Sequence, residues 1–545
     1  HSKASSLPLS SSVNGWLYGD VECKSKLLTI EDDSIDWKRV STAIQKSNVL
    51  KELHLGGIFI FPDDNDSNFR ESDLRALMFA FANGGTQLTK LILDSMSCGV
   101  TPADIEVLIH HVSRGNSLAG FEFHNALEDG GHSSLMKLGI LICYLTHHKQ
   151  LKSLSIVGVQ LTPPWICDIA SMLEKPDSKL VGLELGNNGI GIKEFETIVE
   201  SLSLNNTLRG LTYDNFDGHQ GAQLIDRLLS HKDLRLMMLS TPGMQIADPD
   251  AAMLSRRLDS YGNLTYLQVE LSPLLGVDGW HAFGRYIQSS TCILHQLNLP
   301  NSHLDDAKLL ALSTWVSRLE TMNFLHIPDN RAITVNGWRV FFNLVIENPM
   351  SNMEYIDISR CGIEDETINM LASALRGNRK LEGFSVVRAE DDATDVTKEG
   401  WGSFMGILCD RTSIEATYLS NHTLFEIDAS EPLPAELMEL LSFNIGNAKT
   451  VARFKVLEVH FAPKFDISAI RPLLAIDNIK LLPQVINWVG KDEGYGLDED
   501  FLTVMYELVR HSPLFVEHGA NYSVYTNVRS PAKKRLRTSP EATIM

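Results

Sequence analysis

The chain has 545 residues, and a single hydrophobic core stops growing at roughly 250–300 residues, so it needs several domains or an elongated repeat array. Its formal net charge of −20 repels nucleic-acid phosphates and anionic lipid headgroups, which argues against nucleic acid or a membrane surface as a partner. The seven cysteines are scattered and form no C-x-x-C pair, so neither a disulfide framework nor a zinc site is predicted.

The N-terminal segment, residues 1–24, is rich in serine and lacks a basic start followed by a long apolar run. A secretion signal is therefore not predicted. No part of the chain approaches about 18 uninterrupted apolar residues, which disfavours a membrane-spanning helix. Together with the scattered cysteines, these features predict a cytoplasmic or nuclear protein.

One short pattern recurs along most of the chain. Its clearest copy is residues 180–190, LVGLELGNNGI, which follow L-x-x-L-x-L-x-x-N-x-L. Most neighbouring copies lie about 26–33 residues apart, a spacing typical of repeat arrays. Degenerate copies begin near Leu50, Leu88, Leu118, Leu151, Leu180, Leu208, Leu234, Leu264, Leu294, Met322, Met353 and Leu381.

Each copy combines two periodicities. Apolar residues first alternate, as at Leu183 and Leu185, which predicts a short strand with one buried side. The spacing then changes to that of a helix, as at Ile198, Val199 and Leu202. Each repeat is therefore expected to pair one strand with one helix that packs behind it.

A second motif, acidic/amide-G-W-x-x-F, occurs at residues 278–283, 336–341 and 399–404. It is typical of a helix start, with Asp278, Asn336 and Glu399 as predicted N-caps and the Trp and Phe on the buried side. Asn188 and Asn330 follow their strands at the position where an amide can satisfy backbone groups of the adjacent coil.

These residues resemble the ribonuclease-inhibitor-like class of leucine-rich repeat proteins over about residues 25–425. The resemblance implies an α/β leucine-rich repeat solenoid, a horseshoe with a parallel concave sheet and convex helices, closed by a C-terminal helical cap. Residues 412–424, 433–434 and 451–455 are similar to uncharacterised leucine-rich repeat proteins of unicellular algae, which implies no activity.

Four segments follow from the pattern: an N-terminal segment (1–24), the repeat array (25–429), a helical C-terminal cap (430–518) and a basic tail (519–545) expected to be disordered. Apolar residues in the cap have helical spacing without a strand signature. The tail contains a basic cluster that is either a nuclear-import signal or a solvated basic tail. The candidate import residues are Lys533, Lys534, Arg535 and Arg537.

No sequence motif for catalysis or for a cofactor is found. The turn at residues 189–194 follows a strand as a dinucleotide-binding loop does, but Glu194 replaces its third glycine. The motifs H-E-x-x-H, G-x-S-x-G and G-x-x-x-x-G-K-[ST] are missing. We therefore expect neither an enzyme nor a bound metal or cofactor.

The predicted function is a protein-interaction scaffold or adaptor that binds its partner on the concave face; a regulator of an enzyme, such as a nuclease inhibitor or GTPase activator, is the alternative. Outward aromatic residues on later strands favour an interface, although they could instead pack on one another or under a loop. Acidic neighbours favour a basic protein partner. The candidate partner-binding residues are Tyr266, Gln268, Glu270, Asn298, Phe324, His326, Tyr355 and Asp357.

Overall fold

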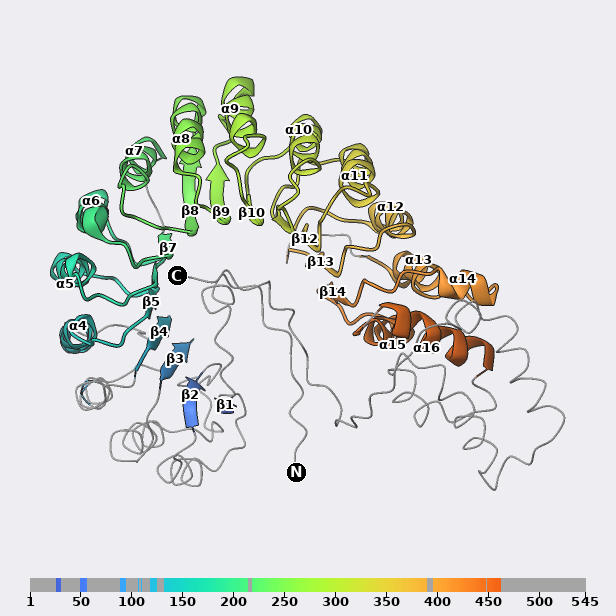
Figure 1. Ribbon diagram of the computed structural model, residues 1–545, viewed down its shortest axis with the longest axis horizontal. Coiled ribbons are helices and arrows are strands. Elements are labelled where there is room, and N and C mark those ends of the chain that lie inside the picture. Colours follow the sequence, from blue (N-terminus) through green and yellow to red (C-terminus); the bar gives the residue numbers. More distant parts are fainter. Residues whose placement is uncertain are drawn as a thin grey trace, which may run out of the picture. The chain divides into compact units, whose positions relative to one another are not determined.

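The computed structural model describes residues 26–30, 50–55, 89–94, 106, 109, 118–124, 132–213, 218–389, 396–446 and 448–461. The chain divides into two units, His1–Pro300 (unit 1) and Asn301–Met545 (unit 2). In each unit, short parallel strands form one layer and helices pack along one side of it (Figure 1). The N-terminal segment, residues 462–518 of the predicted cap and the basic tail lie outside the described residues.

The described part of unit 1 contains ten strands, and each pairs in parallel with the next one along the chain. The repeats pair position by position, so Gly182 lies beside Gly210 and Leu183 beside Leu211. The strands are β1 (Lys26–Ile30), β2 (Leu50–Leu55), β3 (Lys90–Asp94), β4 (Gly120–His124), β5 (Ser153–Val157), β6 (Gly182–Leu185), β7 (Gly210–Tyr213), β8 (Met238–Ile246), β9 (Tyr266–Leu271) and β10 (Gln296–Asn298).

Helices alternate with these strands wherever the structure describes the connection. The described helices of unit 1 are α4 (His132–Thr146), α5 (Pro163–Glu174), α6 (Ile192–Ser201), the 3₁₀ turn η2 (Leu202–Leu204), α7 (Gly218–Leu228), α8 (Asp248–Tyr261) and α9 (Val277–Ile287). In the described residues, no helix is both long and apolar enough to cross a membrane.

Unit 2 continues the same alternation with its own parallel strands. Its described strands are β11 (Phe324–His326), β12 (Tyr355–Asp357), β13 (Gly383–Ser385) and β14 (Glu426–Asp428). Its described helices are α10 (Asp306–Val316), α11 (Val335–Phe341), the π-helix η3 (Phe342–Ile346), α12 (Asp365–Leu375), α13 (Lys398–Leu408), α14 (Ile414–Tyr418), α15 (Ala435–Phe443) and α16 (Ala448–Phe461).

The core lies between the strand layer and the helices. Leu183, Leu185, Ile356 and Ile358, the alternating apolar residues of two predicted strands, are at most 1% exposed. Burying each such side chain contributes roughly 1.5–3 kcal/mol, which explains why the period-two pattern selects this strand orientation. The predicted fold, a leucine-rich repeat solenoid, is confirmed, and the strands β1 and β14 lie outside the copies recognised in the sequence.

Buried asparagines join neighbouring coils as predicted. Asn188 Oδ1 accepts a hydrogen bond from the Val159 N–H at 2.8 Å, and its Nδ2 donates to the Ile156 carbonyl at 2.6 Å. In unit 2, Asn330 Oδ1 accepts from the Leu304 N–H at 3.0 Å. These amides satisfy backbone groups that stacking removes from water.

The G-W-x-x-F motif begins helices, but its predicted N-caps were placed two residues too late. Helices α9, α11 and α13 have Gly276, Thr334 and Thr397 as N-caps. In α11 and α13 the threonine hydroxyl accepts a hydrogen bond from the backbone N–H two residues on, whereas Asn336 and Glu399 already lie inside the helix.

The motif glycine is required by a contact between consecutive helices. At the start of α13, Asp365 of α12 accepts hydrogen bonds from the N–H and the hydroxyl of Thr397, at 2.8 Å and 2.7 Å. A Cβ on Gly400 would overlap Asp365 Oδ1. Asp306 of α10 and Gly337 of α11 repeat this arrangement two helices earlier in unit 2.

Substituting this glycine should therefore destabilise unit 2. We expect Gly400→Ala to lower the free energy of unfolding by about 1–3 kcal/mol, because the new methyl group displaces a carboxylate that holds two hydrogen bonds. Gly402 lies in the same helix with open space at its Cβ position, so Gly402→Ala should raise stability by roughly 0.5–1 kcal/mol through helix propensity. Denaturant unfolding checks both, and two changes of the same sign would contradict the contact.

Candidate functional site

The strand face of unit 1 carries a row of polar side chains linked across strands. Register places Glu122, Ser155, Glu184 and Thr212 beside one another on β4 to β7. Glu122 forms an ion pair with Lys90 at 3.0 Å. The row before it is built largely from Gly120, Ser153, Gly182 and Gly210, so this part of the face offers little side-chain bulk.

Ser155 and Glu184 of this row, together with His124 at the end of β4, resemble a catalytic triad in composition only. His124 Nε2 lies 2.7 Å from Ser155 Oγ, and Ser155 Oγ donates to Glu184 Oε2 at 2.7 Å. Since the serine proton is directed at the carboxylate, the histidine must donate to the serine and cannot act as its base. In a hydrolytic triad the histidine stands between the serine and the acid. The contact therefore supports a structural role.

The four predicted partner-binding residues of unit 1 lie together on β9 and β10, and three of them form hydrogen bonds within the sheet. The Tyr266 hydroxyl donates to Gln268 Oε1 at 2.8 Å, and Asn298 lies beside Gln268 in register. Glu270 Oε2 accepts from the Gly243 N–H at 3.1 Å. Tyr266 is only 5% exposed, and burial raises the pKa of its phenol well above the ordinary value. This tyrosine packs within the sheet and presents little surface.

The other four predicted residues lie together on the strand face of unit 2. Register brings them beside two further strands, β13 and β14, in two rows. We call this set the aromatic–acidic face. It consists of Phe324, His326, Tyr355, Asp357, Gly383, Ser385, Glu426 and Asp428.

The centre of the aromatic–acidic face is the ring of Tyr355. Tyr355 is partly exposed, and its ring covers Gly383. A Cβ added to Gly383 would lie only 2.9 Å from Tyr355 Cδ2. It would also lie 3.1 Å from the Cβ of Glu426 on the other side. His326 flanks the ring at a centroid distance of 5.7 Å. Burial, followed by the charges of the nearby carboxylates, raises the pKa of Tyr355 well above its ordinary value. The phenol therefore stays neutral at physiological pH.

A hydrogen-bonded network occupies the second row of this face, next to the row that contains Tyr355. Burial opposes ionisation of Asp357, but hydrogen bonds from His326 and Ser359 outweigh it and hold the pKa of this carboxyl below its ordinary value. The Ser359 N–H donates to Asp357 Oδ1 at 2.9 Å, and Ser385 Oγ donates to Asp428 Oδ2 at 3.1 Å. Asp357 is therefore held in its charged form, and hydrogen bonds hold both carboxylates in position.

Two acidic residues of this face were missed in the sequence. Glu426 and Asp428 belong to β14, where Leu424 starts a copy too short to match the repeat pattern. The triplet Glu426-Ile427-Asp428 nevertheless repeats the outward-inward-outward order of Tyr355-Ile356-Asp357. This shared order of residues is the feature of the sequence from which β14 and its two acidic residues could have been predicted.

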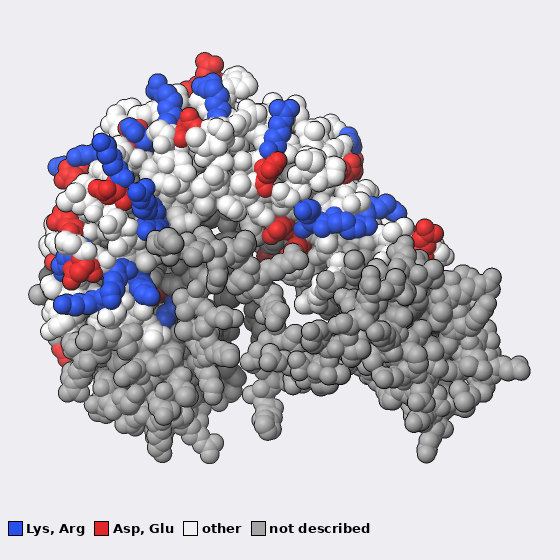
Figure 2. All heavy atoms as spheres, viewed as in Figure 1, with Lys and Arg blue, Asp and Glu red and all other residues white. Residues whose placement is uncertain are grey.

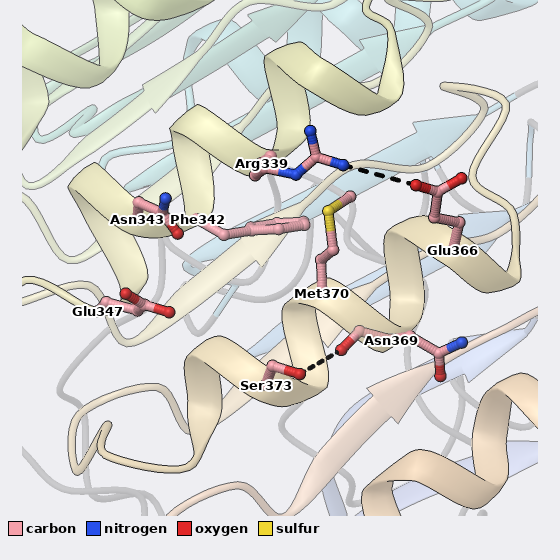
Figure 3. A pocket seen from close by; sticks show the side chains of 8 residues that line it. All are labelled: Arg339, Phe342, Asn343, Glu347, Glu366, Asn369, Met370 and Ser373. Atoms are coloured by element: carbon pink, nitrogen blue, oxygen red, sulfur yellow. Dashed lines mark hydrogen bonds and ion pairs between the residues drawn. The ribbon is translucent and has the colours of Figure 1, made fainter.

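The helix side of unit 2 contains a groove between η3 and α12, shown in Figure 3. Its cavity volume is about 600 Å³, and Phe342 and Met370 supply its apolar surface. Arg339 pairs with Glu366 at 3.5 Å at one end, and the Ser373 hydroxyl donates to the Asn369 carbonyl. These polar groups are used internally, so the groove is a weaker candidate than the strand face.

Charges on the outer surfaces of the helices are mixed. In the view of Figure 2, basic and acidic side chains lie next to one another. In unit 1, for example, Arg227 pairs with Glu196 at 3.0 Å and with Glu200 at 2.9 Å. Mixed, mutually paired charges are typical of a solvated surface. Among the described residues, no three His, Cys, Asp or Glu side chains are grouped to hold a metal ion.

Among solved structures, a chain in the crystal structure of the Rad7 and Elc1 complex in yeast is similar to part of this chain. It has a TM-score of 0.33 and 15% sequence identity, with 54% of this chain and 83% of that chain covered. No protein-family model matches the sequence.

Two curated proteins are similar over part of their length. Over 260 residues, 47% of this chain, the sequence is 25% identical to NACHT, LRR and PYD domains-containing protein 5 of Homo sapiens. Over 112 residues, 21% of this chain, it is 30% identical to ribonuclease inhibitor of Sus scrofa. The matches span 21% and 24% of these proteins, a quarter or less of their length. The sequence thus resembles leucine-rich repeat proteins, in agreement with its strand–helix repeats.

Proposed function

We propose that the chain is a protein-interaction scaffold or adaptor whose strand face binds a protein partner. The observation that carries this proposal is the aromatic–acidic face of unit 2, where partly exposed Phe324 and Tyr355 lie beside fixed carboxylates. Aromatic side chains contribute most of the binding energy at many interfaces, and surrounding polar groups set specificity.

The sequence similarities support the same class of function. Both curated relatives are repeat proteins, and a stack of repeats presents a continuous sheet surface to a partner. The internally paired charges of the helix side make that side less suited to a specific partner.

The double variant Phe324→Ala, Tyr355→Ala should weaken capture of the physiological partner by at least about tenfold, the effect expected for two aromatic hot-spot residues. Capture from the native extract, quantified by mass spectrometry against the unmodified chain, measures this. Tyr266 is left unchanged because its burial would confound binding with stability.

The matched control is Val340→Ala, Met350→Ala, which removes one exposed apolar side chain from α11 and one from the loop between η3 and β12. It should leave capture unchanged. Equal loss in both variants, or none in the aromatic one, would place the interface elsewhere.

Nuclease inhibition is the second candidate, favoured by the 30% identity to ribonuclease inhibitor. An inhibitor, like a scaffold, acts by binding a protein without catalysing a reaction, but its partner is an enzyme. Ribonuclease activity in the presence of excess chain distinguishes an inhibitor from a scaffold with another partner.

A further inference from the structure

We propose that the aromatic–acidic face of unit 2 recognises an arginine side chain of an extended basic segment in the protein partner, with the guanidinium stacked on Tyr355 and paired with Glu426 and Asp428. This inference rests on the proposed function and names the chemistry of the partner.

The first argument is the position of the Tyr355 ring. The ring packs closely on Gly383, and Tyr355 is partly exposed, so part of this side chain remains accessible to a partner. The hydroxyl interacts with Ser385 on the next strand, which holds the ring across the sheet. A flat aromatic surface fixed at both ends suits stacking by a planar cation.

The second argument is the excess of carboxylates in these four strands. The triplets of β11 to β14 read FLH, YID, GFS and EID, and contain three carboxylates but no lysine or arginine. His326 lies 3.6 Å from Asp357, and both side chains are largely buried. Glu426 is exposed and Asp428 partly so, which leaves these two carboxylates facing a partner. A cation is the complementary ligand.

The third argument separates arginine from lysine. A guanidinium is planar, stacks on an aromatic ring and donates two parallel hydrogen bonds to a carboxylate. An ammonium is a compact, strongly hydrated charge that uses the ring and the carboxylates less well. Since ring and carboxylates meet within three adjacent strands, the guanidinium satisfies both together.

The test uses the full chain and a fluorescent peptide of alternating arginine and serine, with matched lysine and citrulline peptides. In fluorescence anisotropy the arginine peptide should bind at least about fivefold more tightly than the lysine peptide, while the uncharged citrulline peptide should bind weakest. Glu426→Gln and Asp428→Asn should each weaken arginine-peptide binding by about five- to tenfold. Tyr355→Leu should remove most of the preference for arginine over lysine.

Glu366→Gln is the control, because it removes an exposed carboxylate from the helix side of the same unit. It should leave binding unchanged, and circular dichroism confirms that every variant is folded. Equal affinities for arginine and lysine peptides, or equal effects of Glu366→Gln and Glu426→Gln, would overturn the proposal.

One outcome separates this inference from the proposed function on which it rests. If partner capture depends on Phe324 and Tyr355 but the arginine peptide does not bind, only the arginine inference fails.

The chain's own basic cluster is tested by replacing Lys533, Lys534, Arg535 and Arg537 with serine. Tighter peptide binding after this change would make the chain itself the occupant and overturn the assignment to a partner.

Discussion

Replacing Trp338 with alanine should lower the free energy of unfolding of unit 2 by about 3–5 kcal/mol, the range for removing a fully buried large aromatic side chain. Trp338 is 1% exposed and packs against Phe341 and Phe342 at centroid distances of 5.8 Å and 5.9 Å. Both neighbours are themselves fully buried, so the structure around the cavity has little freedom to collapse. Denaturant unfolding monitored by circular dichroism measures the loss.

Val340→Ala is the matched control, because Val340 lies in the same helix but is 37% exposed. It should change the free energy of unfolding by less than about 0.5 kcal/mol. A Trp338→Ala effect no larger than that of Val340→Ala would show that the tryptophan does not anchor α11.

Unit 2 should become more stable as the pH rises above about 7, because of one buried lysine. Lys455 of α16 is completely buried, and its Nζ donates to the carbonyls of Leu408 at 2.6 Å and Asn421 at 3.1 Å. Burial lowers the pKa of this amine to about 7, although the nearby Cys409 partly opposes the shift. A neutral amine still has two N–H groups for the two carbonyls, so deprotonation removes the burial cost and keeps the bonds.

The direction of this pH dependence follows from the number of protons that the folded and unfolded chains bind. Between about pH 7 and the ordinary lysine pKa, the unfolded chain holds a proton that the folded chain has released, so the free energy of unfolding rises by up to about 1.4 kcal/mol per pH unit. Below pH 7 both states are protonated and this contribution vanishes. His422 responds in a separate, more acidic window, because burial, followed by the charge of Lys455, lowers its pKa to about 4.

Comparison with Lys455→Met isolates the effect. The free energy of unfolding of the variant is subtracted from that of the unmodified chain at each pH, which removes the contributions of cysteines and tyrosines common to both. The remaining difference should grow by on the order of 3 kcal/mol between about pH 7 and 9.5. Parallel profiles for the two proteins would mean that Lys455 keeps its ordinary pKa. Hydrogen exchange of α16 over the same range localises the change.

The repeat signature determined much of the candidate surface because strand side chains alternate strictly. The rule that placed Leu183 and Leu185 inside also placed Phe324 and Tyr355 on the strand face, where the structure has them partly exposed. The rule did not predict that Tyr266, which occupies the corresponding outward position of its strand, is buried. That burial depends on hydrogen bonds with Gln268 and on neighbouring strands, which the local pattern does not encode.

The misplaced N-caps have a related cause. Asp278 and Asn336 are of types favoured at N-caps, but in all three helices the N-cap lies two positions before the predicted residue. In unit 2 the helix start is fixed by Asp306 and Asp365 from preceding helices, 28 and 32 residues away. Propensity within the helix could not reveal a partner at that distance.

The sequence by itself determined the strand–helix repeat, the buried side of each strand and the asparagines that join the coils, because these depend on side-chain periods of two and about 3.6. Only the tertiary structure decided that Tyr355 covers Gly383 beside Glu426, and that Lys455 reaches two backbone carbonyls. These contacts join residues far apart in the chain. They form only when stacking sets which coils are neighbours and in what register.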